Sequence, residues 1–342
     1  MIRPSAIGDI IMASAMLPRL RRTFPQARLY WMAEPAMAPL LRQHPDLDEV
    51  ICWPKREWTH LIKTGHLGAL AREIKAFRAN LTAKKPDLVL DVQGLLRSRF
   101  LAWLTGAPLR VGFRSKEPHL GLMTHVIDKG PSTKRIGSEY HYILDVLGVA
   151  PLQPGWTFPI AENTMQSVSA LLQREGIDGP YAVLAPFTTR PQKHWLEDRW
   201  ARVADRLKKE FALKPILLGA SQDRHAAQRI RSHSSEHVHV LCGQTNLLES
   251  FAVVTGASLT IGVDTGLTHM AMVQNRPAIA LFGATCPYLH TGSNHAVVLY
   301  KRMPCSPCRR RPTCGQAFPC MAAIREDDVL TAAHRVLDSS KG

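Results

Sequence analysis

Residues 261–271 decide the fold: Ile261-Gly262-Val263-Asp264-Thr265-Gly266-Leu267-Thr268-His269-Met270-Ala271. An apolar strand ends at Asp264, the chain turns through Thr265 and Gly266, and a helix follows. Glycine lets the backbone approach a ligand, and the exposed amides of a helix N-terminus favour phosphate. The segment therefore predicts a turn that binds a pyrophosphate. The alternative is an ordinary turn in which Asp264 caps the helix and His269 hydrogen-bonds on the helix surface.

Similar apolar runs recur along the chain and alternate with longer amphipathic stretches. They are Leu29-Tyr30-Trp31-Met32, Leu88-Val89-Leu90, Tyr181-Ala182-Val183-Leu184, Pro215-Ile216-Leu217-Leu218, Leu259-Thr260-Ile261-Gly262-Val263 and Ala278-Ile279-Ala280-Leu281-Phe282. Strand, helix and strand in succession indicate parallel sheets with helices on both faces, which is an α/β fold. No G-x-G-x-x-G follows an early strand, which argues against an NAD-dependent dehydrogenase.

The chain is long enough for two such domains. Its 342 residues, 45% of them hydrophobic, can form two separate cores. Three prolines and a glycine lie within residues 150–159, where neither a helix nor a central strand can continue. We expect an N-terminal domain over residues 1–152, a C-terminal domain over 160–325, and a terminal helix and tail over 326–342.

The beginning of the sequence departs from this pattern. A doubly wound sheet normally has a buried strand ahead of its first loop. Here only Met1-Ile2-Arg3 precede the loop from Pro4 to Asp9. Either the first strand is short in this protein, or the start was assigned several residues too late.

Asp9 lies at the head of an apolar helix expected over residues 10–17. An acidic residue in this place caps free amides and needs no further role. The alternative is a general base that faces a cleft, because α/β sheets bind ligands beyond the carboxyl ends of their strands.

Two loops in the C-terminal half carry polar side chains directly after expected strands. The loop after residues 181–184 contains Thr188, Thr189 and Lys193, and hydroxyls with an ammonium can neutralise a leaving diphosphate. A solvated surface loop is the alternative. Asp223 follows the next strand, where a carboxylate either accepts a ribose hydroxyl or caps a helix.

The composition favours anionic partners. Lys and Arg number 43 against 28 Asp and Glu, for a net charge of +15, which suits phosphates, acidic lipids or nucleic acid. No apolar run approaches the roughly 18 residues of a membrane span, and no signal-peptide pattern opens the chain. We expect a cytoplasmic protein.

Four of the seven cysteines crowd into one stretch, with the spacing C-x2-C-x5-C-x5-C: Cys305, Cys308, Cys314 and Cys320. In a reducing compartment such crowding suggests a metal before a disulfide. Four thiolates suit a tetrahedral Zn or Fe that staples a loop and leaves no open position for catalysis. Free thiols are the alternative.

Four segments, in this order, resemble the lipopolysaccharide heptosyltransferases, glycosyltransferase family 9. They are Ser5 to Asp9, Asp91-Val92-Gln93-Gly94-Leu95-Leu96-Arg97-Ser98, Thr188-Thr189 with Lys193-His194-Trp195, and Val263 to His269. The resemblance spans essentially the whole chain and is strongest to the heptosyltransferase I branch. It implies a GT-B architecture, with two Rossmann-like domains facing across a cleft, the donor on the C-terminal one and the acceptor on the N-terminal one.

By this resemblance Asp9 is the base that activates a hydroxyl of 3-deoxy-manno-octulosonic acid (Kdo), which attacks ADP-heptose in one inverting displacement. Lys193 would stabilise the departing ADP, and catalysis would need no cofactor. The residues that would hold the donor are Thr188, Thr189, Lys193, Asp223, Asp264, Thr265, Gly266 and His269. Asp223 stands where relatives often carry a glutamate.

The acceptor, Kdo on lipid A, would meet four basic residues of the N-terminal domain: Lys55, Arg56, Arg114 and Lys116. The charge of +15 fits peripheral contact with the cytoplasmic face of the inner membrane. A heptose or a protein are alternative acceptors, the latter because some relatives with an iron-binding cysteine loop modify proteins. A metal-stabilised nucleic-acid-binding protein is the alternative from another class, but only Phe318 near the cysteines could stack on a base. We therefore expect no nucleic-acid partner.

Overall fold

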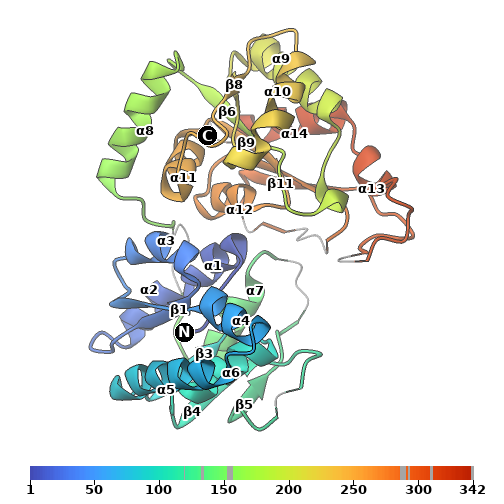
Figure 1. The fold of residues 1–342 in the computed structure, drawn as a ribbon. Coiled ribbons are helices and arrows are strands. Elements are labelled where there is room, and N and C mark those ends of the chain that lie inside the picture. The colour runs from blue at the N-terminus through green and yellow to red at the C-terminus, as the bar shows by residue number, and fades with distance from the viewer. Residues whose placement is uncertain are drawn as a thin grey trace. The chain divides into compact units, whose positions relative to one another are not determined.

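Strands and helices alternate along both halves of the chain in the computed structural model (Figure 1). The structure describes residues 1–118, 120–131, 135–151, 157–285, 290–291, 293–308 and 311–339. Residues 152–156 of the expected linker and residues 340–342 of the expected tail lie outside these ranges. The chain divides into one unit of Met1–Ser132 and Gly137–Gln153 and another of Thr133–Ile136 and Pro154–Gly342.

The first unit contains two small parallel sheets, β1-β2 and β3-β4-β5. Its elements are α1 (Ile7–Ser14), α2 (Met16–Thr23), β1 (Tyr30–Ala33), α3 (Ala38–Arg42), β2 (Glu49–Cys52), α4 (Lys55–Lys63), α5 (Leu67–Ala83), β3 (Leu88–Asp91), α6 (Leu96–Leu104), β4 (Leu109–Phe113), β5 (His125–Ile127) and α7 (Ser138–Val146). A short 3-10 turn lies at Pro35–Met37 in this unit, and two more, at Pro191–Lys193 and Ser221–Asp223, lie in the second unit.

The apolar run after Asp9 forms two helices in place of one. Pro18 has no amide hydrogen, so the bond to the carbonyl of Ser14 cannot form, and α1 ends at that residue. Ile10 and Ile11 are fully buried, which makes α1 part of the core of its unit.

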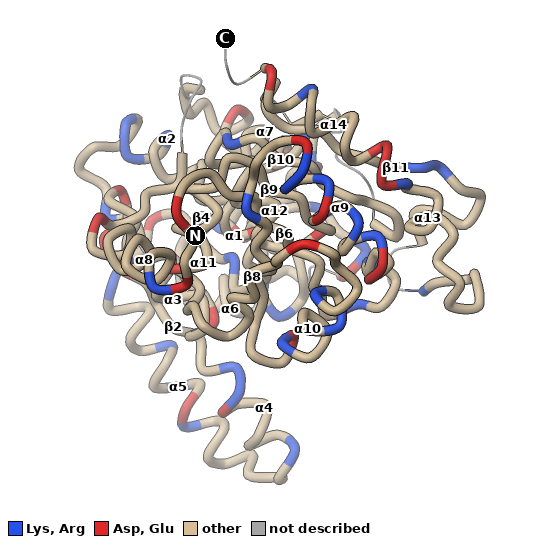
Figure 2. Tube along the Cα trace, turned by 90° about the horizontal axis from the view of Figure 1, so that it is seen from above, with Lys and Arg blue, Asp and Glu red and all other residues tan. Residues whose placement is uncertain are grey.

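Trp58 of α4 packs edge-on against Phe77 of α5, with ring centroids 5.4 Å apart. Figure 2 shows Lys and Arg distributed along α4 and α5.

The second unit contains a single six-stranded parallel sheet in the order β11-β10-β9-β6-β7-β8. Its elements are α8 (Glu162–Arg174), β6 (Tyr181–Ala185), α9 (Glu197–Phe211), β7 (Lys214–Leu217), α10 (Arg224–Ser232), β8 (His239–Val240), α11 (Leu247–Gly256), β9 (Leu259–Val263), α12 (Gly266–Val273), β10 (Ala278–Phe282), β11 (Ala296–Tyr300), α13 (Pro319–Ala322) and α14 (Glu326–Asp338). All six strands expected from apolar runs are confirmed, four of them in this unit.

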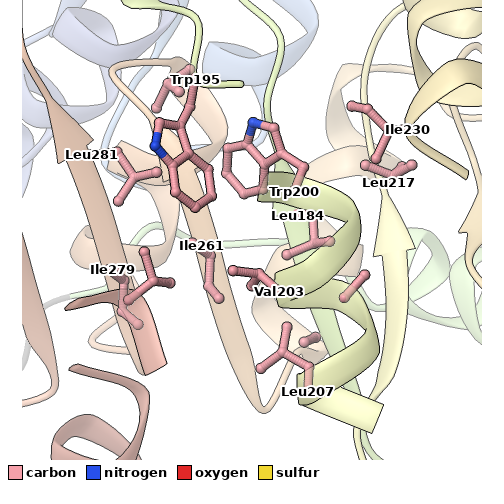
Figure 3. Packing of buried hydrophobic residues seen from close by; sticks show 14 of the residues in the cluster. Leu184, Trp195, Trp200, Val203, Leu207, Leu217, Ile230, Ile261, Ile279 and Leu281 are labelled. Atoms are coloured by element: carbon pink, nitrogen blue, oxygen red, sulfur yellow. The ribbon is translucent and has the colours of Figure 1, made fainter. Parts of the chain in front are cut away.

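The core of the second unit lies between its sheet and its helices (Figure 3). Trp200 of α9 meets Trp195 edge-on, with ring centroids 5.1 Å apart, and both rings are buried. The terminal helix α14 packs on α9, β10 and β11, so it belongs to this unit. In the described part of the chain no helix is both long and apolar enough to cross a membrane.

Candidate active site

The strand order of the second unit indicates where a nucleotide would bind. From β6 the connections run toward β8, and from β9 they run the opposite way toward β11. The order of the strands therefore reverses between β6 and β9, and the carboxyl ends of two adjacent strands at such a switch point are where doubly wound sheets bind nucleotides. The loop with Thr188, Thr189 and Lys193 follows β6, and the turn with Asp264 and Thr265 follows β9.

Asp264 joins these two loops through its carboxylate. Its Oδ2 lies 2.5 Å from Nζ of Lys193, and its Oδ1 lies 3.0 Å from Nε2 of His269. The lysine Nζ also donates to the backbone carbonyl of Asp264 at 3.3 Å. The three side chains are largely buried, so the switch point contains a fixed Lys-Asp-His cluster.

The environment keeps the Asp264 carboxylate ionised. Burial by itself raises its pKa, but the hydrogen bond and charge of His269 and the charge of Lys193 outweigh burial and lower the pKa well below its ordinary value of 3.8. Since the carboxylate can only accept, His269 carries its proton on Nε2 in this arrangement.

The N-terminus of α12 opens directly beside this cluster. Its N-cap is Thr265, not Asp264, and the side chain of Thr265 makes no capping hydrogen bond. The first amides of the helix are therefore oriented for an anionic ligand. Gly262, in β9 just before the turn, leaves room for the start of α12, because a Cβ at this position would lie 2.1 Å from Oγ1 of Thr268. Of the two threonines in the other loop, Thr188 is half-buried and Thr189 is exposed.

Asp223 lies at the carboxyl end of β7, the neighbour of β6. Its Oδ2 accepts the amide of Ala220 at 2.8 Å, which stabilises the start of the 3-10 turn Ser221–Asp223. Asp223 is also the N-cap residue of α10, but its side chain makes no capping hydrogen bond to that helix. Gly219 allows a close approach in this loop, because a Cβ would lie 2.6 Å from the ring of Phe187. The end of the second strand is also where Rossmann-type sheets hold a ribose.

Asp9 of the first unit lies in the first turn of α1 without capping it. Its carboxylate forms an ion pair with Arg3. Arg3 is itself buried and donates to the carbonyl of Val92 at 2.8 Å, so the guanidinium holds the aspartate at the end of the sheet. Arg3 was not among the site residues predicted from the sequence, although a basic residue directly ahead of the loop to Asp9 was an available signal.

The segment from Asp91 to Ser98 acts as a structural turn after β3. Oδ1 of Asp91 accepts the amides of Gln93 and Gly94 at 3.0 and 3.2 Å, and Oδ2 accepts the hydroxyl of Ser98 at 3.0 Å. Arg99, which was also missed, is buried and donates to the carbonyl of Glu117 at 2.6 Å. Arg99 thereby supports the loop that carries two of the proposed acceptor residues.

Those acceptor residues lie on two separate parts of the first unit. Lys55 begins α4 and pairs with Glu34 at 2.7 Å, while Arg56 is exposed. Arg114 follows β4 and pairs with Asp128 at 2.6 Å, and Lys116 is exposed in the same loop.

The four clustered cysteines influence one another without forming a metal site. Burial and the neighbouring Cys314 and Cys305 raise the pKa of Cys308, and burial with Cys305 and Cys308 raises that of Cys320. All four are free thiols. Across the residues the structure describes, no group of three or more His, Cys, Asp or Glu side chains is arranged to hold a metal ion. The coordination geometry expected from the spacing is therefore not assembled.

The chain consists of two α/β units built on parallel sheets, and in the second unit a lysine and two threonines follow the strand at which the strand order reverses. This architecture is that of the GT-B class of glycosyltransferases. Residues 74–317 match the family model described as glycosyltransferase family 9 (heptosyltransferase). The chain belongs to this family, and it is an enzyme of the heptosyltransferase kind.

Known relatives agree with this assignment. The chain is 27% identical over 305 residues to lipopolysaccharide heptosyltransferase 1 of Escherichia coli K12, covering 85% of this chain and 89% of that protein. It is 24% identical over 298 residues to lipopolysaccharide heptosyltransferase 2 of the same strain, covering 84% and 82%. The structure of E. coli heptosyltransferase WaaC with ADP-2-deoxy-2-fluoro heptose is similar at a TM-score of 0.71 and 24% identity, covering 97% of this chain and 98% of that one.

Proposed function

We propose that this enzyme transfers heptose from ADP-heptose to Kdo of the lipopolysaccharide inner core. The observation that carries the proposal is the Lys193-Asp264-His269 cluster beside the open N-terminus of α12. A diphosphate fits there because it would receive helix amides, hydroxyls and one ammonium together. The relatives named for lipopolysaccharide heptosyltransfer support the choice of sugar and acceptor.

In this proposal the donor binds at the carboxyl ends of β6 and β9. Thr188, Thr189, Lys193 and the α12 amides, with Thr265 and Gly266, hold the diphosphate. Asp264 meets the heptose hydroxyls, His269 lies near the diphosphate, and Asp223 accepts a ribose hydroxyl. Since negative charge grows on the ADP oxygen as the bond to the anomeric carbon breaks, Lys193 stabilises the transition state more than the ground state.

Asp9 serves as the general base in the acceptor half of the reaction. The acceptor hydroxyl oxygen attacks the anomeric carbon, its proton passes to the Asp9 carboxylate, and ADP leaves with the electron pair of the broken C–O bond. The configuration at the anomeric carbon inverts in this single displacement. Arg3 is a positioning residue, because it pairs with Asp9 and is tied to the backbone at Val92.

The proposal is tested by incubating purified enzyme with ADP-heptose and Kdo2-lipid A, without added divalent metal, while ADP release is followed. Turnover on this acceptor is the expected result. Turnover only on an acceptor that already carries heptose would move the enzyme to a later step of the core. No turnover on either lipid, with turnover on a protein, would overturn the lipopolysaccharide assignment.

We also propose that the enzyme contacts the cytoplasmic face of the inner membrane through α4 and α5. Residues 55–83 contain six Lys and Arg against two Glu. Ile62 and Leu67 are 58% and 63% exposed near the connection between the two helices. Basic charge beside exposed apolar side chains suits an anionic lipid surface, where the acceptor is anchored.

For the four cysteines we propose a structural metal ion, Zn or Fe, with no part in catalysis. The thiols are close enough to shift one another's pKa, and metal binding would require their deprotonation and a closing of the loop. Metal analysis of the purified protein, beside a Cys308→Ser variant, tests this. Metal-free wild-type protein whose Tm does not change on adding Zn or Fe would overturn it.

A further inference from the structure

The side chain of Gln93 lies just past the carboxyl end of β3 and carries a polar atom that the fold does not use. Its Oε1 is buried, and among the residues that the structure describes it has no hydrogen-bond partner. A buried amide oxygen is normally bonded, because burying it unpaired costs free energy. An oxygen that its own chain leaves unpaired can accept a hydrogen bond from a bound molecule.

The backbone at Gln93 is firmly held. The amides of Gln93 and Gly94 both donate to Oδ1 of Asp91, at 3.0 and 3.2 Å. Gly94 has a φ of +72°, a conformation that favours glycine over other residues. Because the turn is fixed by these bonds, it presents the glutamine side chain from a defined place at the end of the strand.

A single guanidinium connects this turn with Asp9. Nη1 of Arg3 donates to the carbonyl of Val92 at 2.8 Å, and Val92 directly precedes Gln93. Nη2 of the same arginine pairs with the carboxylate of Asp9. Since both nitrogens belong to one planar group, the proposed base and the turn that carries Gln93 lie close together within the first unit.

The turn also adjoins the loop that carries the proposed acceptor residues Arg114 and Lys116. A Cβ at Gly94 would lie 3.5 Å from Cβ of Phe113 and 3.8 Å from Cβ of Ser115. Ser115 stands between the two basic residues in the sequence. The turn therefore adjoins both the arginine that pairs with the proposed base and the basic loop.

We propose that Gln93 binds the acceptor: its Oε1 accepts a hydrogen bond from one hydroxyl of the acceptor sugar and thereby orients the attacking hydroxyl toward Asp9. This inference rests on the proposed function, in which Asp9 is the base. A sugar acid such as Kdo carries a carboxylate as well as several hydroxyls. Its carboxylate can pair with Arg114 or Lys116 while one hydroxyl reaches the glutamine. Two contacts on one rigid ring determine which hydroxyl faces the base.

The variant Gln93→Met tests this, because it nearly keeps the length of the side chain and removes the amide. We expect kcat/KM for Kdo2-lipid A to fall about 10- to 100-fold, since the acceptor hydroxyl loses its partner. The dissociation constant of ADP-heptose and the Tm should stay at their wild-type values, because in the described structure Oε1 makes no hydrogen bond that the substitution could break.

Gln26→Met is the matched control, because Gln26 is an exposed glutamine of the same unit. A kcat/KM for the acceptor equal to that of this control would overturn the proposal. A fall in kcat/KM that comes with a lower Tm or weaker ADP-heptose binding would also overturn it, since those changes would indicate a structural role for Gln93.

Acceptor analogues that each lack one hydroxyl of the accepting Kdo identify the contact. With the wild-type enzyme, one analogue should lose about as much kcat/KM as Gln93→Met loses on the complete acceptor, and this analogue should lose little more with the variant. Losses that add for every analogue would overturn the proposal. Wild-type turnover only on an acceptor that already carries heptose would change the proposed function, and analogues of that acceptor would then test Gln93 in the same way.

Discussion

Asp264 organises the candidate donor site at the level of single residues. One of its oxygens holds Lys193 and the other holds His269, so two side chains from different segments are fixed by one buried carboxylate. In the proposed function, a diphosphate would meet a lysine that is already oriented, and this would reduce the entropy lost on binding. Removing the carboxylate would free Lys193 and leave its charge without this partner.

Asp264→Asn should therefore destabilise the protein by about 3 kcal/mol at neutral pH. The pKa of Asp264 is lowered on folding, so its contribution to stability is complete above the unfolded value of 3.8 and is lost as the pH falls through the lower folded value. Urea unfolding across this range should show a constant difference between wild type and variant above about pH 5 that shrinks in more acidic solution. A difference that grows on acidification would contradict this account.

At Asp9 the prediction concerns catalysis. Asp9→Asn should lower kcat by about 10²- to 10⁴-fold and leave the dissociation constant of ADP-heptose unchanged, because only the base is lost. Asp145→Asn is the matched control, since Asp145 also pairs with an arginine in the first unit, at 2.5 Å. An Asp9→Asn enzyme as active as the Asp145→Asn control would remove Asp9 from the mechanism.

At the level of elements, the site depends on two strands lying side by side. β6 and β9 pair in parallel, so the loop ending at Lys193 and the turn at Asp264 emerge next to each other although 71 residues separate them. The helix α12 then contributes amides that no single residue could replace.

Lys193→Ala should weaken ADP-heptose binding by about 10- to 100-fold, because a charge-assisted contact to phosphate is worth about 1.5–3 kcal/mol. The fall in kcat/KM should be larger than the loss of affinity, since the charge on the leaving group grows in the transition state. Calorimetry with ADP-heptose and steady-state kinetics measure both. Lys208→Ala, at an exposed position of α9, is the control. Identical affinities and rates for the two variants would show that Lys193 has no role in donor binding or catalysis.

For the whole molecule, the charged residues that give the net charge of +15 are distributed unevenly along the chain. The region of α4 and α5 is strongly basic and carries exposed apolar side chains. Each basic residue close to an acidic membrane contributes about 1 kcal/mol, so several together give measurable attraction.

Reversing Lys63 and Lys75 to glutamate should lower binding to vesicles that contain anionic phospholipid by at least about tenfold. Both residues are exposed and lie outside the proposed acceptor set. Co-sedimentation at several salt concentrations measures the effect, which should weaken as salt screens the charges. The control is the pair Lys208→Glu and Lys209→Glu on α9. An equal loss of vesicle binding in this control would show that binding depends on the total charge of the protein and not on α4 and α5.

Some features could be predicted because their signal is local. The apolar runs specify strands, so β6, β9 and β10 fall within one or two residues of the expected ranges. The turn from Asp264 to Gly266 was evident from a glycine and polar residues placed between a strand and a helix. The break between α1 and α2 was not predicted, although Pro18 is its local cause.

The sequence by itself determined the α/β fold class, the family and the loops that carry polar groups, since periodicity and motifs are properties of neighbouring residues. Only the tertiary structure decided the partners: Arg3 with Asp9, and Lys193 with Asp264. It also decided that the four thiols are not arranged as ligands, across the ranges that it describes. Such pairings depend on strand order and on the directions of side chains distant in sequence, and no local pattern encodes either.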